Sequence, residues 1–189
     1  MATLQADPRI RAFLDLIALS EGTSSSPITR ADGYDIIVTG IDGGNRFDDF
    51  STHPFADHQL AIVVRDAEPP VYGRNQAGQV DPSIVLSKAK PPLKSTASGR
   101  YQITYPTWSY LYPYLDDRSF SPRAQDAAAI KLLEQCAAYV DIIQQDIPRA
   151  INRAALTWAS FPGNSYSQGG HSEAKLLEWY AASIEAQKV

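Results

Sequence analysis

A glutamate closes an apolar helical run near the start of the chain, where an ordinary capping residue would be expected. In the run RAFLDLIALSEGT, the apolar residues Ile10, Phe13 and Ile17 fall on one helical stripe, and the next place on that stripe is position 21. Glu21 should therefore lie at the edge of the apolar face, just before Gly22 ends the helix. Partial burial and the negative end of the helix dipole both favour a protonated carboxyl group there. Such a group can donate a proton near neutral pH, so Glu21 is a candidate general acid.

A second polar stretch, PPLKSTASGRYQITYPTW, contains side chains that suit a sugar ligand. Small and hydroxyl-bearing residues lead up to Gly99, where a ligand can approach the backbone closely. The next three residues, Arg100, Tyr101 and Gln102, can hydrogen-bond to a sugar or stack on it. Taken alone, the same stretch is equally an ordinary turn before a helix that starts at Pro106.

The composition excludes several other kinds of chemistry. The formal charge is -4 and no block of Lys or Arg occurs, which argues against nucleic acid as the main partner. The three histidines, His53, His58 and His171, are too scattered for a metal site, and no glycine-rich phosphate loop is present. We therefore expect neither a metal nor a cofactor. No apolar run approaches the roughly 20 residues that span a bilayer, and the N-terminus does not resemble a signal peptide.

The first half of the chain should place a small sheet after one helix. Asp7 can cap that helix, and Pro8 suits its first turn. Two stretches rich in β-branched residues, 34–40 and 59–65, are typical of short strands. The Pro- and Gly-rich segment 66–92 then predicts a long loop or a loose hairpin inserted into the domain, and loops of that length are often functional.

The second half should be mainly helical. The run SPRAQDAAAIKLLEQCAAYV opens with Ser121 as the cap and Pro122 at the first helical position. Two further runs, IPRAINRAALTWAS and SEAKLLEWYAASIEAQ, space apolar residues along one helical face. One helix, a small sheet and several C-terminal helices predict an α+β fold in a single domain over residues 1–189.

Six stretches in sequence order resemble the motifs of one known family. They are FLDLIALSEGT, GYDIIVTG, FDDFSTHP, LKSTASGRYQ, FSPRAQDAAA and TWASFPG. They resemble the bacteriophage lambda endolysin family, whose members are lysozyme-like lytic transglycosylases that cleave bacterial peptidoglycan. The resemblance implies a small antiparallel sheet, a mainly helical C-terminal half and a cleft between them. The segment from about Phe55 to Lys90 is longer than the corresponding connection in the family, which affects one wall of the cleft.

The resemblance also implies roles for individual residues. The stretch SEGT matches the motif of the family's catalytic glutamate, so Glu21 would act as acid and then as base. Asp35, in the matching YD, would orient groups in the cleft or have a plain structural role where the strand starts. Arg100 would bind substrate or hold its own loop, and residues 161–171 would form a second lip or a passive connector. The residues expected to line the cleft opposite Glu21 are Ser95, Thr96, Gly99, Arg100, Tyr101 and Gln102.

Enzymes of this family need no second catalytic carboxylate. The C6 hydroxyl of muramic acid attacks C1 of the same sugar, the N-acetyl carbonyl stabilises the intermediate, and the product is a 1,6-anhydromuramoyl end. The Glu-x8-Asp-x5-Thr motif of the other common phage muramidases is absent, because Arg30 stands where the aspartate would be. The alternatives are a hydrolytic muramidase that uses Asp35 or a held water, and a non-enzymatic glycan-binding module.

The expected partners follow from the same resemblance. The substrate would be the glycan strands of peptidoglycan, cleaved at MurNAc–GlcNAc β-1,4 bonds. We expect a monomer that does not insert into membranes by itself. It would stay in the host cytoplasm until a holin opens the inner membrane and admits it to the periplasm and cell wall.

Overall fold

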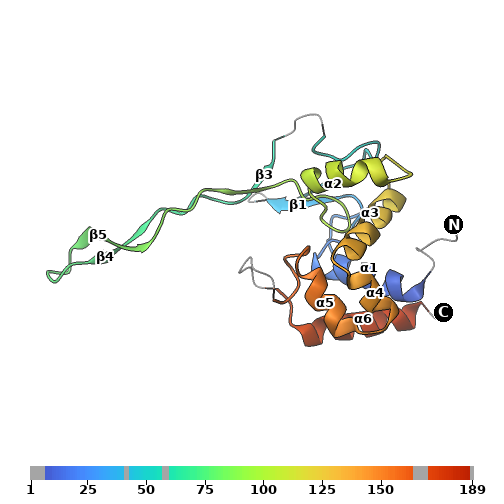
Figure 1. Cartoon of the computed structure of the whole chain (residues 1–189). Coiled ribbons are helices and arrows are strands. Elements are labelled where there is room, and N and C mark those ends of the chain that lie inside the picture. Colours follow the sequence, from blue (N-terminus) through green and yellow to red (C-terminus); the bar gives the residue numbers. More distant parts are fainter. Residues whose placement is uncertain (1–6, 41–42, 57–59, 164–169, 188–189) are drawn as a thin grey trace.

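The computed structural model describes residues 7–40, 43–56, 60–163 and 170–187 of the chain (Figure 1). The N-terminal helix α1 (Pro8–Ser20) begins where the sequence predicts, since the Asp7 side chain accepts a hydrogen bond from the backbone N–H of Arg9. Most of its surface is buried, and it packs against α6, α4 and α3. Helix α1 is therefore a central element of the core, and its C-terminal end is held firmly in place.

Two short antiparallel sheets follow α1. Strand β1 (Ile36–Gly40) pairs with β2 (Gly43–Arg46), and strand β3 (Ile62–Arg65) pairs with β6 (Leu93–Ser95). The backbone N–H of Gly99 also donates to the carbonyl of Ile36 at 2.7 Å. This bond holds the turn after β6 against β1. The strands predicted at 34–40 and 59–65 are both present, each beginning two or three residues later than predicted.

The segment 66–92, expected as a long loop or a loose hairpin, contains paired strands, so the hairpin is the observed form. Strand β4 (Val71–Arg74) pairs with β5 (Val80–Ser87), and Glu68 bridges to Lys90 nearer the body. Figure 1 shows this hairpin, which we call the arm, extending away from the rest of the molecule. Valine, isoleucine and tyrosine at the strand positions favour pairing in spite of the surrounding prolines and glycines.

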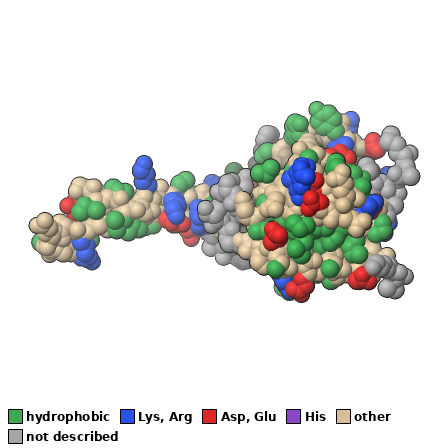
Figure 2. All heavy atoms as spheres, turned by 60° about the horizontal axis from the view of Figure 1, so that its bottom comes forward, with side chains coloured by type: hydrophobic (Ala, Val, Ile, Leu, Met, Phe, Trp, Pro, Cys, Tyr) green, Lys and Arg blue, Asp and Glu red, His purple; other side chains and the backbone are tan. Residues whose placement is uncertain are grey.

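The arm presents apolar side chains to solvent. Figure 2 shows hydrophobic side chains along its length together with basic ones. Apolar side chains of β4 and β5 exposed over more than a third of their surface are Val71, Tyr72, Val80, Ile84, Val85 and Leu86. None of the arm residues belongs to the hydrophobic core of the described chain. The arm therefore adds little to the stability of the body.

The second half of the chain is helical, as predicted. The helices are α2 (Tyr105–Leu111) with a 3-10 turn (Tyr112–Tyr114), α3 (Pro122–Gln135), α4 (Ala138–Ile143), α5 (Ile147–Ala154) and α6 (Glu173–Ala186). Ser121 caps α3 as expected. The single helix expected over this run is two helices instead, because Ala137 between them has a left-handed backbone (φ 60°).

The core lies between α1 and the other helices. Phe13 of α1 makes edge-to-face contacts with Phe161 and with Tyr180 of α6. The largest fully buried side chains include Phe13, Leu16, Ile17, Tyr101, Trp108, Phe120, Leu133 and Phe161. Among the helices that the structure describes, none is long and apolar enough to cross a membrane.

Candidate active site

Glu21 caps the C-terminal end of α1, as the sequence predicts. Its backbone N–H donates to the carbonyl of Ile17 at 2.9 Å, and Gly22 follows with φ of +72°, a left-handed conformation that glycine adopts without strain. The side chain is half-buried and one carboxyl oxygen, Oε1, accepts a 2.6 Å hydrogen bond from the hydroxyl of Ser160. The carboxyl group thus lies between the end of α1 and the segment that follows α5.

The environment of Glu21 favours its protonated form. Burial raises the pKa of this carboxyl group to about 7, and the hydrogen bond from Ser160 opposes that rise without cancelling it. Both the carboxylic acid and the carboxylate are therefore populated near neutral pH. One group can then donate a proton in one step and accept a proton in the next.

Glu21 opens into a cavity of about 250 Å³ between the end of α1 and the β1–β2 sheet. The lining residues are Glu21, Gly22, Thr23, Ser25, Ser26, Pro27, Ile36, Gly44 and Gln102. Among these described lining residues, only Glu21 carries a charge. Hydroxyl, amide and backbone groups make up most of the remaining wall, and such groups suit a hydroxyl-rich ligand.

The turn at residues 98–103 brings Gln102 to the cavity. Ser98 and Ile103 exchange backbone hydrogen bonds across the turn, and Gly99 has φ of +75°. A Cβ atom on Gly99 would lie 2.0 Å from the side-chain oxygen of Gln125, so only glycine fits there. Gly99 is predicted to let a ligand approach the backbone closely, but the side chain of Gln125 occupies that space, and Gly99 does not line the cavity.

The structure places Tyr101 in the core rather than in the cavity, contrary to the prediction that it contacts a sugar. Its side chain is 1% exposed, and its hydroxyl donates to Asp126 at 2.6 Å. The indole N–H of Trp158 donates to its backbone carbonyl at 2.9 Å. The ring of Tyr34 packs edge-on against the Tyr101 ring, with the ring centres 6.1 Å apart, and Tyr101 is not among the residues that line this cavity.

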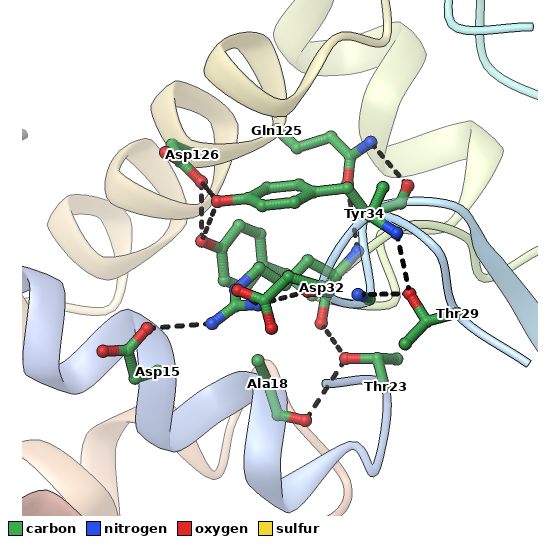
Figure 3. A network of polar contacts seen from close by, with 12 residues as sticks. Asp15, Ala18, Thr23, Thr29, Asp32, Tyr34, Gln125 and Asp126 are labelled. Atoms are coloured by element: carbon green, nitrogen blue, oxygen red, sulfur yellow. Dashed lines mark hydrogen bonds and ion pairs between the residues drawn. The ribbon is translucent and has the colours of Figure 1, made fainter. Parts of the chain in front are cut away.

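Two roles are predicted for Arg100, binding of substrate and support of its own loop. Its contacts in the structure are those of the second, structural role. Its guanidinium group is buried and pairs with Asp15 at 2.8 Å and with Asp32 at 2.6 Å (Figure 3). It also lies over the ring of Tyr34, 5.2 Å from the ring centre. Arg100 therefore ties α1 to the loop at residue 32 and to the start of the sheet.

A polar network extends from Arg100 and holds the cavity walls together (Figure 3). The backbone N–H of Arg100 donates to the side-chain oxygen of Gln125 at 2.9 Å. The side-chain NH2 of Gln125 donates in turn to the carbonyl of Tyr34 at 3.0 Å. The hydroxyl of Thr23 donates to the carbonyl of Arg100 at 2.6 Å. These bonds connect α1, the turn and α3, and they fix the position of Gln102 relative to Glu21.

Asp35 does not line the cavity, and each of its oxygens accepts a hydrogen bond from its own loop. One oxygen accepts from the hydroxyl of Thr29 at 2.5 Å, the other from the backbone N–H of Arg30 at 2.9 Å, and Arg46 lies 3.7 Å away. Burial raises the pKa of Asp35, but the hydrogen bonds from Thr29 and Arg30 outweigh it and the pKa is lowered. A carboxylate with a lowered pKa and these partners organises the loop before β1, which is the structural alternative of its prediction.

Ser95 and Thr96 also lie outside the cavity lining. Ser95 accepts a hydrogen bond from the backbone N–H of Ala97 at 3.1 Å, and Thr96 accepts one from Tyr105 at 3.0 Å. Both hydroxyls thus shape the chain on either side of the turn. Part of the expected second lip at 161–171, namely residues 164–169, lies outside the described residues.

Several lining residues were not predicted from the sequence. Ser25 and Ser26 follow Glu21 closely in EGTSSS, and their position directly after the acid is the signal that could have marked them. Ser160 lies in the family-like stretch TWASFPG, but nothing in that stretch indicates a bond to a residue 139 positions away.

His53 is not among the residues that line the cavity. Its ring is fully buried, one nitrogen contacts the carbonyl of Ile103 at 3.0 Å, and the other accepts from the backbone N–H of Phe55 at 3.2 Å. Burial lowers the pKa of His53 to about 4, so the ring stays neutral. In the described part of the chain, no group of three or more His, Cys, Asp or Glu residues is arranged to hold a metal ion.

A half-buried carboxyl at a helix end, facing a polar cavity beside a small antiparallel sheet, together with a helical C-terminal half, defines a lysozyme-like protein. Comparison with solved structures agrees. Bacteriophage lambda lysozyme complexed with a chitohexasaccharide matches with a TM-score of 0.72 and 32% identity, covering 96% of this chain and 97% of that one. Another structure, lysozyme from bacteriophage lambda, matches with a TM-score of 0.61 and 29% identity over 98% of this chain and 96% of that one.

Sequence comparisons identify the family. The model of the family described as Endolysin matches residues 11–184. The endolysin of Escherichia phage P2 is 40% identical over 178 residues, which cover 94% of this chain and 93% of the relative. The endolysin of Escherichia phage lambda is 34% identical over 168 residues, covering 88% and 85% respectively. The chain belongs to the endolysin family and is a lysozyme-like phage enzyme of cell-wall lysis, which confirms the predicted family and fold class.

Proposed function

We propose that this endolysin cleaves MurNAc–GlcNAc β-1,4 bonds of peptidoglycan by transglycosylation, with Glu21 as general acid and then general base. The observation that carries the proposal is the electrostatic isolation of Glu21. It is the one charged side chain among the described residues that line the cavity, and burial raises its pKa to about 7. The solved complex of bacteriophage lambda lysozyme with a chitohexasaccharide supports a glycan as the ligand.

In the first step, the neutral carboxyl of Glu21 protonates the glycosidic oxygen as its bond to C1 of MurNAc breaks. The departing GlcNAc leaves with a free 4-hydroxyl group. Positive charge develops at C1, and the N-acetyl carbonyl of the same sugar is the proposed source of stabilisation. Glu21 is now a carboxylate, and its hydrogen bond from Ser160 becomes stronger because the acceptor is charged.

In the second step, the C6 hydroxyl of the MurNAc residue attacks C1, and the Glu21 carboxylate takes the proton of that hydroxyl. A 1,6-anhydro bridge forms, the enzyme returns to its protonated state, and no water is consumed. The scheme needs one carboxyl group. Hydrolytic glycosidases that follow the usual pattern need two, one on each side of the bond.

The position of Asp35 disfavours the hydrolytic alternative that uses it as the second carboxylate. It lies outside the cavity lining, and its two oxygens accept hydrogen bonds from Thr29 and from Arg30. A base that activates water must have an oxygen within hydrogen-bond reach of that water, and Asp35, which is 2% exposed, does not line the cavity. We infer that Asp35 supports the loop and takes no part in proton transfer.

Gln102 and the hydroxyls of Ser25 and Ser26 are the proposed contacts for the sugar, since they line the cavity with Glu21. Residues 1–189 act as one catalytic domain that carries the arm. We further propose that the protein works as a monomer and reaches the wall from the host cytoplasm once a holin opens the inner membrane.

Mass spectrometry of the muropeptides released from purified peptidoglycan tests the mechanism. Transglycosylation gives disaccharide-peptides that end in 1,6-anhydromuramic acid, lighter by one water than the hydrolytic products and without a new reducing end. A digest dominated by reducing-end muropeptides would instead establish a hydrolytic muramidase. Binding without any released product would establish a glycan-binding module.

A further inference from the structure

Two serine hydroxyls form a directed chain of hydrogen bonds that ends on Glu21. Ser20 Oγ donates to Ser160 Oγ at 2.8 Å, and Ser160 Oγ donates to Glu21 Oε1 at 2.6 Å. A serine hydroxyl has a single hydrogen. Since Ser160 accepts the hydrogen of Ser20, its own hydrogen is directed to the carboxyl group. Ser20 is 6% exposed, so the first donor in this series of hydrogen bonds is shielded from solvent.

The backbone around Ser160 is held independently of its hydroxyl. Its carbonyl oxygen accepts a hydrogen bond from the backbone N–H of His171 at 3.1 Å, which brings the chain back toward α6. The neighbouring Phe161 is fully buried and contacts Phe13 of α1. Removal of the Ser160 hydroxyl therefore leaves the path of the backbone anchored, and its effect on Glu21 can be measured separately.

The hydrogen bond from Ser160 distinguishes the two carboxyl oxygens of Glu21. Because Oε1 is the acceptor, the proton of the neutral carboxyl group belongs on Oε2. When that proton leaves, the bond to Oε1 becomes charge-assisted and stabilises the carboxylate. No other charged side chain, acidic or basic, occurs among the described residues that line the cavity with Glu21. The end of α1 contributes Ser20, the turn contributes Gln102, and the segment after α5 contributes Ser160, all of them neutral.

We propose that Ser160 is a positioning residue for the acid–base group: its hydroxyl holds Oε1, reserves Oε2 for proton transfer to the glycosidic oxygen, and stabilises the carboxylate that the first step produces. Ser20 orients the Ser160 hydroxyl for this task. The inference rests on the proposed function of Glu21. It adds Ser160, which lies 139 positions from Glu21 in the sequence, to the groups that set the proton affinity of Glu21.

Direct titration of Glu21 tests the inference without any turnover. The protein is labelled with glutamate carrying ¹³C at its side-chain carboxyl, and the Glu21 resonance is identified by its absence from the spectrum of Glu21→Gln. In Ser160→Ala the pKa of Glu21 should rise above the value of about 7 by about one pH unit, as expected for the loss of a hydrogen bond to a charged group. Ser160→Thr should restore the original titration, and Ser20→Ala should give a smaller rise.

Ser109→Ala is the matched control, because Ser109 is an exposed serine on α2. It should leave the titration of Glu21 and the activity unchanged. The kinetic counterpart is the pH profile of kcat on soluble peptidoglycan fragments. Its descending limb at high pH should move upward in Ser160→Ala by the same amount as the titration, with KM unchanged.

An unchanged Glu21 titration in Ser160→Ala would overturn the inference, as would a fall in kcat with no movement of the limb. Failure of the inference about Ser160 can be distinguished from failure of the proposed function of Glu21. If Glu21→Gln were active, the proposed function would be wrong even though Ser160 could still shift the titration of the carboxyl group. If Glu21→Gln is inactive and the pKa of Glu21 is unchanged in Ser160→Ala, only the proposed role of Ser160 is wrong.

Discussion

The hydroxyl of Thr23 donates a 2.6 Å hydrogen bond to the backbone carbonyl of Arg100, a residue 77 positions further along the chain. The same hydroxyl lies 3.2 Å from the carbonyl of Ala18 in the last turn of α1. Thr23 is 2% exposed. This one side chain thus joins the end of the helix that carries Glu21 to the turn that carries Gln102, and these two residues face the same cavity.

Thr23→Val should loosen that connection. Valine keeps the shape of threonine but removes the hydroxyl, which leaves the Arg100 carbonyl buried without this donor. We expect a loss of about 1–2 kcal/mol in the free energy of unfolding, measured by urea denaturation, and a several-fold fall in kcat/KM. Thr23→Ser retains the hydroxyl, so its free energy of unfolding and its kcat/KM should both be close to those of the parent. A valine variant of parental stability would show that the bond is dispensable.

Tyr101 and Gln102 are neighbours with opposite environments, and their variants should separate stability from binding. Tyr101→Phe removes the hydroxyl that donates to Asp126, so thermal unfolding should show a loss of about 1 kcal/mol while KM stays the same. Gln102→Asn shortens a cavity side chain, and asparagine still accepts the left-handed backbone (φ 50°) of this position. Its KM for glycan should rise several-fold. A raised KM in Tyr101→Phe would contradict this prediction, because it would show that the Tyr101 hydroxyl contributes to glycan binding.

The features that the sequence predicts correctly are those governed by neighbouring residues. Asp7, Pro8, Ser121 and Pro122 mark helix starts through local hydrogen bonds and backbone preference. The placement of Glu21 follows from helical spacing and from the glycine after it. The break at Ala137 carries no such mark, because a left-handed alanine has no compositional signature.

The features that the sequence does not predict depend on long-range packing. Tyr101 and Gln102 are both polar turn residues, and only the positions of Asp126 and Trp158 decide that the first points into the core. The contact between Ser160 and Glu21 is likewise created by the packing of the segment after α5 on α1. Local residue preferences contain no information about either choice.

Two groups with strongly shifted pKa values, Glu21 and His53, should give opposing pH dependences of stability. The pKa of Glu21 is about 7 in the folded protein against 4.5 for an unperturbed group, so its ionisation destabilises the fold as pH rises from 4.5 to 7. The pKa of His53 is about 4 against 6.5, so its protonation destabilises the fold as pH falls from 6.5 to 4. Each contribution reaches up to about 3 kcal/mol, and the two nearly cancel between pH 4.5 and 6.5.

Single variants should uncover each dependence. Glu21→Gln removes the first contribution, so its free energy of unfolding should fall as pH drops from 6.5 to 4.5, and it should exceed that of the parent at pH 7 and above. His53→Gln should show the opposite slope, becoming more stable as pH drops. Urea unfolding at several pH values measures both. Parallel curves for the two variants would contradict the shifted pKa values of Glu21 and His53.

The arm should be separable from the fold. Replacing residues 68–90 with a short Gly/Ser linker removes exposed apolar side chains and none of the hydrophobic core, so the melting temperature should change little. The arm continues from β3 and β6, and β3 lies beside β1, whose Ile36 lines the cavity. We therefore expect weaker binding of long glycan strands and unchanged cleavage of short ones. Failure of the shortened protein to fold would show that the arm is structural.

Turnover of purified peptidoglycan by Glu21→Gln tests the central claim most directly. Glutamine keeps the size of the side chain and can still pair with Ser160, but it can neither donate the proton nor take it back. The variant should fold, bind insoluble peptidoglycan in a pull-down as the parent does, and lose at least about 10²–10⁴-fold in turnover. Asp35→Asn, measured beside it, should retain clear activity. Near-parental turnover by Glu21→Gln would contradict the account, since the carboxyl group at the end of α1 would then have no part in the chemistry.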